Sequence, residues 1–317
     1  MKRQFPKYIA ALLLFGSNGV FAAGIDLASS EIVFFRAFLG CLLLAAVFLL
    51  SRQRPTLHLH RKDALFVSLS GVALAANWLF LYEAYQRIGV SLATVLDYCG
   101  PIIVMALAPL AFGERLTRAK VGGFFVVAAG FALMNANFAD GGMDGWGLAC
   151  GILAAVMYAV MVSFSKKSGG AYGLEGVVLQ MAACLATVAV YVGATRGFGF
   201  VASIPFDAWP AIFVLGAVNT GVGCYLYFSS IGGLPVQTVA VCGYLEPLAA
   251  VAFSAALLGE TLQAVQVAGA ALILGGALFA ESADALKGRR KHAHRMSERP
   301  CGIAAERRAV IARPNAR

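Results

Sequence analysis

Charged residues are scarce in this chain. Only 13% of its 317 residues are Asp, Glu, Lys or Arg, whereas 60% are hydrophobic. A soluble domain typically has about 25% charged and about 45–50% apolar residues. The deficit of charge therefore excludes an ordinary soluble domain. Apolar runs of membrane-spanning length favour an integral membrane protein instead.

The apolar runs also lack the residue patterns of most metal sites and enzymes. The chain has no CxxC pair, and all of its histidines lie in charged segments outside the runs: His58, His60, His292 and His294. No P-loop motif GxxxxGK[ST] occurs, which argues against direct coupling to ATP. We find no acids paired at metal-ligand spacing and no Ser or Cys nucleophile with a base nearby. The sequence therefore predicts neither an enzyme nor a bound metal or other cofactor.

Ten apolar runs are present, each close to the roughly 20 residues that a helix needs to cross the hydrocarbon. They cover residues 7–26, 31–51, 63–86, 90–112, 117–137, 146–165, 172–194, 207–231, 235–258 and 263–283. Because a backbone in lipid must satisfy its own hydrogen bonds, each run is predicted to be a transmembrane helix. The first run imitates a signal peptide, but similar runs recur along the chain, which favours a retained span.

Basic residues between the runs predict the orientation. One side of the membrane collects Lys2, Arg3, Lys7, Arg52, Arg54, Arg61, Lys62, Arg115, Arg118, Lys120, Lys166, Lys167 and the basic tail. The other side has only Arg87 and Arg196, together with Asp26, Glu31, Asp140 and Asp144. The positive-inside rule then predicts a multi-pass protein of the plasma membrane, a bacterial inner membrane, with both termini in the cytoplasm.

The tail, residues 284–317, is predicted to be disordered and cytoplasmic because it contains no apolar run. Topology already explains the net charge of +9, so the sequence predicts the lipid bilayer as a partner and no nucleic acid. Contact of the tail with anionic headgroups is an alternative role. The sequence does not indicate an oligomeric state.

One segment of the sequence is repeated. "DYCGPIIVMALAPLAFGE" (97–114) and "GYLEPLAAVAFSAALLGE" (243–260) align without a gap, and the match extends to 77–134 over 223–280. Val90, Tyr98, Pro101, Glu114 and Gly130 each have an identical counterpart 146 residues later. Five spans per half is an odd number, so the second half must enter the membrane from the opposite side. The sequence thus predicts an all-α membrane protein of two inverted five-helix repeats, 7–137 and 143–283.

The ten runs and the paired "P…GE" segments resemble the drug/metabolite transporter superfamily, in its ten-helix EamA-type branch, over about residues 7–283. The resemblance implies two five-helix bundles, a central cavity, and export or exchange of amino acids or other small metabolites. The family's Arg near the start of helix two matches Arg36, its mid-helix prolines match Pro101 and Pro247, and its Glu before the second proline matches Glu246. Asp97 and Glu83 depart from the family pattern, which puts the common neutral amino-acid substrate in question.

Four ionisable residues lie within the predicted spans: Arg36, Glu83, Asp97 and Glu246. A charge at the bilayer centre costs at least about 2.5–3.5 kcal/mol, so such residues face the bundle interior and find partners. Arg36 and Glu83 lie near the outer ends of their spans and could reach the headgroups instead. Asp97 and Glu246 lie too deep for that, and they are the first candidates for substrate binding or ion coupling.

Pro101 and Pro247 are predicted to bend their helices near mid-membrane. A proline in a helix interior removes the hydrogen bond to the carbonyl four residues earlier, which here belongs to Asp97 or Gly243. Each bend is either a tolerated kink or part of the wall of a cavity. Polar and aromatic groups at membrane depth, which could also serve only helix packing, complete the candidate site: Asn18, Asn77, Trp78, Tyr98, Asn219 and Tyr244.

These residues predict a secondary transporter that works by alternating access, moves a small polar metabolite such as an amino acid, and favours export. Asp97 has three possible roles: an ion pair with Arg36, a carrier of a coupling proton, or a partner for a substrate ammonium while Arg36 holds a carboxylate. An exchanger or importer of organic anions is the alternative within transport. An intramembrane enzyme is the third and least favoured class.

Overall fold

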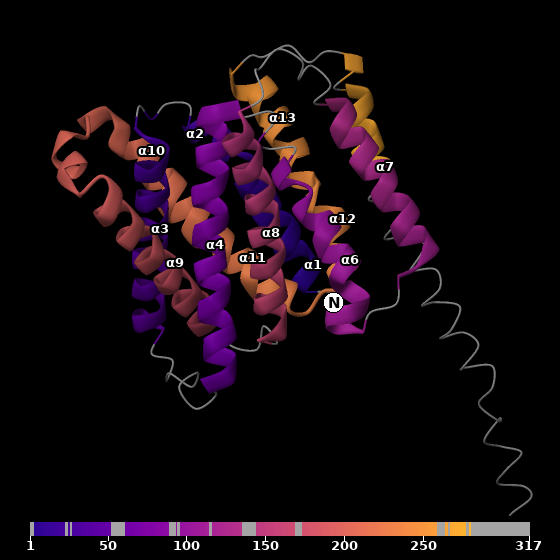
Figure 1. The fold of residues 1–317 in the computed structure, drawn as a ribbon, viewed down its shortest axis with the longest axis horizontal. Helices are drawn as coiled ribbons and strands as arrows, with labels where there is room; N and C mark the ends of the chain where they lie inside the picture. The colour runs from indigo at the N-terminus through magenta and orange to yellow at the C-terminus, as the bar shows by residue number, and fades with distance from the viewer. Residues whose placement is uncertain are drawn as a thin grey trace, which may run out of the picture.

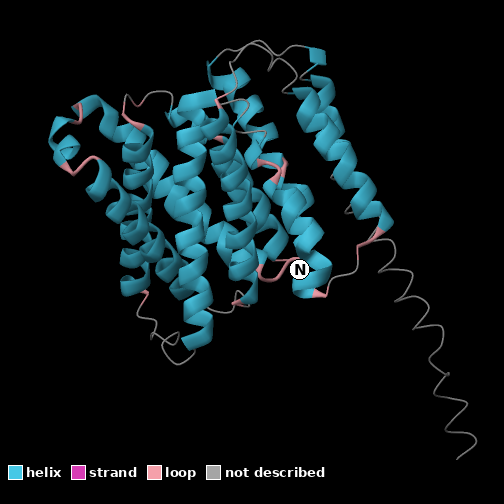
Figure 2. Cartoon of the chain, in the orientation of Figure 1, coloured by secondary structure: helices cyan, strands magenta, loops and turns pink. Residues whose placement is uncertain are grey.

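The computed structural model of the chain is a bundle of helices (Figure 1). It describes residues 3–22, 25, 27–51, 61–88, 93, 96–113, 116–134, 144–168, 173–258, 264–265, 267–276 and 279, and it contains no strand within those ranges (Figure 2). The tail lies outside the described residues, as do the repeated glutamates Glu114 and Glu260, so the predictions for these positions stay predictions.

Among the described residues, six helices are long and apolar enough to cross a membrane. They are Ser29–Leu50, Arg61–Ile88, Gly145–Lys167, Gly173–Thr195, Phe206–Ile231 and Val236–Leu257. Two shorter apolar helices, Gly100–Phe112 and Val267–Gly276, fall within two further predicted runs. The prediction of an all-helical, multi-pass membrane protein is therefore confirmed.

The first part of the chain has six labelled helices in the described residues. They are α1 (Gln4–Gly16), α2 (Asn18–Ala22), α3 (Ser29–Leu50), α4 (Arg61–Ile88), α6 (Gly100–Phe112) and α7 (Arg118–Met134). The second part has α8 (Gly145–Lys167), α9 (Gly173–Thr195), η2 (Gly199–Ser203), η3 (Phe206–Ala208), α10 (Trp209–Phe213), η4 (Val214–Val222), α11 (Gly223–Ile231), α12 (Val236–Gly243) and α13 (Leu245–Leu258).

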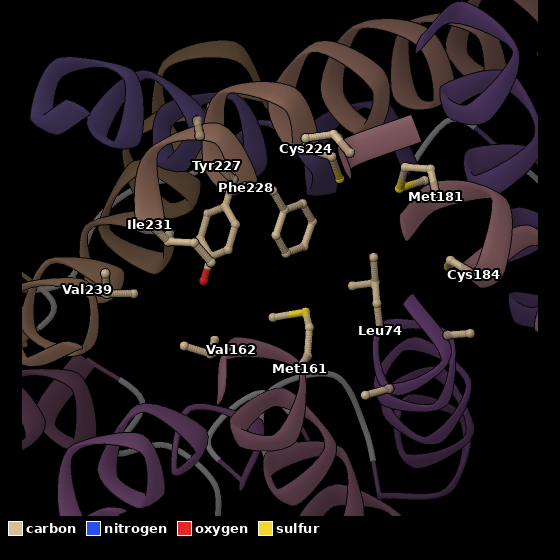
Figure 3. Packing of buried hydrophobic residues seen from close by; sticks show 14 of the residues in the cluster. Leu74, Met161, Val162, Met181, Cys184, Cys224, Tyr227, Phe228, Ile231 and Val239 are labelled. Atoms are coloured by element: carbon tan, nitrogen blue, oxygen red, sulfur yellow. The ribbon is translucent and has the colours of Figure 1, made fainter. Parts of the chain in front are cut away.

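The bundle core lies where α4, α8, α9, α11 and α12 meet. Leu74, Met161, Met181, Tyr227 and Val239, one from each of these helices, belong to one buried cluster (Figure 3). Small residues allow the helices to approach: a Cβ at Gly71 of α4 would collide with the backbone of Gln180 in α9. Such small-residue contacts drive helix association in membranes, where apolar burial alone cannot distinguish protein from lipid.

In both proline-containing segments the α-helix gives way to a turn just before the proline, and we call these segments the broken helices. Residues 98–99 form a turn, and α6 begins at Gly100 with Pro101 in its first turn. In the second segment α12 ends at Gly243, and α13 begins at Leu245, two residues before Pro247. The turn before each proline is where a bend is expected, and the predicted bend itself stays a prediction. A proline fits the first turn of the second half-helix because the N–H that it lacks has no partner there anyway.

Candidate functional site

The two broken helices meet at equivalent residues. The Tyr244 hydroxyl donates a hydrogen bond of 2.7 Å to the Tyr98 carbonyl, and the two residues are 146 positions apart, which is the offset of the sequence repeat. Their ring centroids lie 5.7 Å apart, and both rings pack against Phe131. The segment that the sequence repeats is therefore also the segment where its two copies touch.

One carboxylate lies beside each break. Asp97 precedes the first turn, whereas Glu246 follows the second. Asp97 lies just before the first break and accepts a hydrogen bond of 2.8 Å from the Asn77 amide. Glu246 lies in the first turn of α13, where the helix dipole favours an acid. The Tyr98 hydroxyl lies beside the Glu246 carboxylate, which is also within electrostatic range of Asp97 and Arg36. Two acids, two tyrosines and an asparagine thus converge where both helices are interrupted.

Arg36 of α3 is buried, with 6% of its surface exposed. Its Nε donates to Thr220 Oγ1 at 3.1 Å, and its Nη1 donates to the Tyr82 hydroxyl at 3.0 Å. The guanidinium carbon lies 4.6 Å from the centroid of the Trp78 ring, which gives a cation–π contact. All three partners are neutral.

Arg36 and Asp97 do not form an ion pair. Ion pairs between described residues join Arg87 to Glu83 and to Asp144, and Arg196 to Glu31; Arg36 and Asp97 are not joined in this way. Of the three roles predicted for Asp97, the direct pair with Arg36 is therefore not formed in this structure. The roles that involve a proton or a substrate ammonium stay open.

A π-helical segment, η4, supplies the hydroxyl that Arg36 binds. Thr220 Oγ1 donates to the carbonyl of Leu215, five residues earlier. Its neighbour Asn219 donates to Ser17 Oγ at 2.9 Å and to Asn18 Oδ1 at 3.0 Å, at the point where α1 gives way to α2. Single π-helical turns are frequent at functional sites because they redirect side chains by one residue.

Three further tyrosines that the sequence argument did not select line the same region. The hydroxyls of Tyr158 and Tyr227 are 3.0 Å apart, and the Tyr8 hydroxyl donates to the Val239 carbonyl at 2.8 Å. A Cβ placed on Gly243 would lie 3.6 Å from the Tyr8 hydroxyl and 4.0 Å from that of Tyr158. The sequence contained a signal for these three residues, because each places a hydroxyl within a predicted apolar run.

Glu83 does not join this group. Its carboxylate lies 2.6 Å from Arg87 Nε, and Arg87 Nη1 lies 3.1 Å from Asp144, which caps α8. The side chains are one-third or more exposed, so the pairs contribute little to stability. The hydrogen bond from Arg87, aided by the backbone N–H of Trp146, holds the pKa of Asp144 below its usual value. Glu83 thus belongs to a surface ion cluster at one end of α4.

The donor set does not suit a metal ion. Among the residues that the structure describes, no three His, Cys, Asp or Glu side chains lie close enough together to hold one. The site instead offers two carboxylates, one buried guanidinium and several phenol hydroxyls. These groups can bind and orient a polar solute.

The comparison with protein families agrees with this architecture. The model of the EamA-like transporter family matches residues 8–136 and again 145–281. This chain belongs to that family. The relatives and the family are transporters and not enzymes.

Several curated relatives are 24% identical to this chain over the aligned residues. An uncharacterized transporter of Bacillus subtilis aligns over 85% of this chain and 86% of its own length. The threonine/homoserine exporter RhtA of Salmonella typhimurium aligns over 87% and 92%, and the pseudopaline exporter CntI of Pseudomonas aeruginosa over 80% and 86%. A solved crystal structure with 18% identity superposes with a TM-score of 0.74 over 87% of this chain and 96% of that chain, which shows a shared fold.

Proposed function

We propose that this EamA-like transporter exports a small zwitterionic metabolite, such as an amino acid, across the plasma membrane by alternating access between two inverted five-helix halves. The observation that carries the proposal is the meeting of the two broken helices at Tyr98 and Tyr244, with Asp97 and Glu246 beside the breaks. Discontinuous helices at a repeat interface form the substrate and ion sites of many secondary transporters.

Reciprocal packing supports the inverted repeat, with the halves at 7–137 and 143–283. Helix α4 packs on α8 as α11 packs on α1, and α6 packs on α8 as α13 packs on α1. Glycines repeat the pattern: a Cβ on Gly130 would meet Gly269, and one on Gly276 would meet Gly123. Because 123 corresponds to 269 and 130 to 276, these are the two copies of one contact related by a two-fold axis.

Charge placement supports a zwitterionic substrate. Asp97 and Glu246 provide anionic groups for an ammonium, and Arg36 is a buried cation whose hydrogen-bond partners, Thr220 and Tyr82, are neutral. A substrate carboxylate would give Arg36 a charged partner, and charge-assisted hydrogen bonds are roughly twice as strong as neutral ones. The two acids at the breaks disfavour the alternative of an organic-anion exchanger, because an anion would be repelled by both when they are ionised. The printed names of the threonine/homoserine and pseudopaline exporters support export of amino-acid-like solutes.

A thermal-shift screen tests the substrate class. Amino acids, organic acids and nucleosides are added in turn to the purified protein, and the melting temperature is measured. We expect a zwitterionic amino acid to stabilise the protein, by about 2.7 kcal/mol when its concentration is 100 times Kd. The Arg36→Lys variant, which keeps the charge but loses the planar fork, should lose most of this stabilisation. Stabilisation by organic acids alone would contradict the zwitterionic substrate.

Reporter fusions test the orientation. We expect fusions at Lys167 and after Ala285 to report the cytoplasm and a fusion near Gly142 to report the exterior. The Arg87–Asp144 pair and the hydrogen bond from Gln86 to Ser29 support this, since they bring the proposed outer ends of α3, α4 and α8 together. A cytoplasmic signal near Gly142 would remove the inverted-repeat argument.

A further inference from the structure

Asn77 has no amide hydrogen left for a substrate. The side chain is 4% exposed, and its Nδ2 donates to Asp97 Oδ1 at 2.8 Å and to the Ala154 carbonyl at 2.9 Å. A carboxamide nitrogen carries two hydrogens, so both are committed. This arrangement differs from the direct substrate contact that the sequence suggested for Asn77.

The partners of Asn77 lie on three segments. Asn77 belongs to α4, Asp97 lies just before the turn at residues 98–99, and Ala154 lies in the middle of α8. Small residues on α8 bring these segments together, since a Cβ on Gly147 would collide with the end of α4 and one on Gly151 with Leu96. The amide therefore bridges the proposed first half, which holds Asp97, to the proposed second half, which holds α8.

Asn77 is the residue that donates a hydrogen bond to the Asp97 carboxylate in the described part of the chain. The other ionisable groups that face Asp97 act through space only: Glu246 of α13, Tyr158 of α8, and Tyr98 and Cys99 in the turn. The orientation of the carboxylate therefore depends on its hydrogen bond from Asn77.

We infer that Asn77 is a positioning residue that ties the Asp97 carboxylate to α8 and does not itself bind substrate. The inference rests on the proposed role of Asp97 in transport. An N–H bond to an ionised carboxylate is stronger than one to a neutral acid. Neutralising Asp97, by a proton or by a substrate ammonium, therefore weakens its bond from Asn77 and loosens the tie between the Asp97 carboxylate and α8.

Labelling with dicyclohexylcarbodiimide tests the inference without knowledge of the substrate. This reagent reacts with protonated carboxylic acids in apolar surroundings. The full-length protein in liposomes is labelled over a series of pH values, and mass spectrometry quantifies modification at Asp97 and at Glu246. In Asn77→Leu we expect the pH of half-maximal labelling at Asp97 to rise by about one unit, because the lost bond favoured the ionised form about tenfold. The value for Glu246, which Asn77 does not contact, should move by clearly less than the value for Asp97.

Two further variants make the result decisive. Ser70→Ala removes another α4–α8 bridge, in which Ser70 Oγ donates to the Met161 carbonyl at 2.8 Å, without touching Asp97. It should leave both labelling curves unchanged. If Asn77→Leu does not fold, Asn77→Ser, which offers one hydrogen for two acceptors, should still shift the Asp97 curve. An unshifted Asp97 curve in the Asn77 variants, or an equal shift in Ser70→Ala, would overturn the inference. The proposed function fails separately, if Asp97→Asn transports like the wild type.

Discussion

The Asp97→Asn variant is expected to reach the membrane at wild-type abundance and to lose transport, or to lose the dependence of transport on a pH gradient. Asparagine keeps the shape of aspartate and can still accept the hydrogen bond from Asn77, so the local fold should survive. What is lost is the negative charge. Hydrogen bonds to charged groups are worth about 1.5–3 kcal/mol, so apparent substrate affinity should fall about 10- to 100-fold if Asp97 binds an ammonium.

Transport is measured in membrane vesicles, with abundance checked by immunoblotting. Glu83→Gln is the matched control, because it removes an acid from the surface cluster with Arg87 and leaves the broken helices untouched. Its transport should stay within about twofold of the wild type, since exposed ion pairs contribute little. If Asp97→Asn transports like the wild type with unchanged pH dependence, Asp97 neither binds the substrate nor couples transport to a proton.

Alanine at Gly130 or at its counterpart Gly276 should destabilise the protein strongly. A Cβ on Gly130 would lie 2.7 Å from the Gly269 carbonyl oxygen, and one on Gly276 would lie 2.9 Å from that of Gly123. Backbone atoms cannot rotate away, so α7 and the last described helix, Val267–Gly276, would have to separate. Overpacking of this kind costs about 1–3 kcal/mol or more, and both variants should melt at clearly lower temperature in detergent.

Gly122 provides the control on the same helix. A Cβ there would meet no atom within 4 Å, so Gly122→Ala should be neutral or slightly stabilising. If the Gly130 and Gly276 variants melted like the Gly122 variant, the close contact between α7 and the last described helix would be wrong. If only one of the two were destabilised, the two-fold relation between these contacts would fail.

The sequence predicted the helical membrane class and the residues at the breaks because each depends on local pattern. Apolar run length determines which segments can cross the hydrocarbon. The repeated tyrosine and proline positions indicated where the two copies correspond, and the copies touch at Tyr98 and Tyr244. Acids without access to the headgroups could be expected in the interior, and Asp97 and Glu246 lie there.

Side-chain partners depended on packing that no local pattern contains. A bend was expected at Pro101. The residue lies in the first turn of α6, just after the break, where the N–H that a proline lacks would have no helical partner anyway. The π-helical segment η4 that aims Thr220 at Arg36 was not predicted, because an apolar run of spanning length indicates a helix but not its π-helical hydrogen bonding. Glu83 looked like a site residue by depth, yet Arg87 one turn later holds it at the surface.

The most direct test of the account is flux from liposomes. Purified protein is reconstituted into liposomes loaded with a mixture of amino acids and organic acids, and the released solutes are identified by mass spectrometry. The account predicts that at least one zwitterionic amino acid leaves chemically unchanged, faster than from protein-free liposomes and faster than from liposomes with Asp97→Asn. Release of organic acids alone, a chemically altered solute, or equal flux through Asp97→Asn would contradict it.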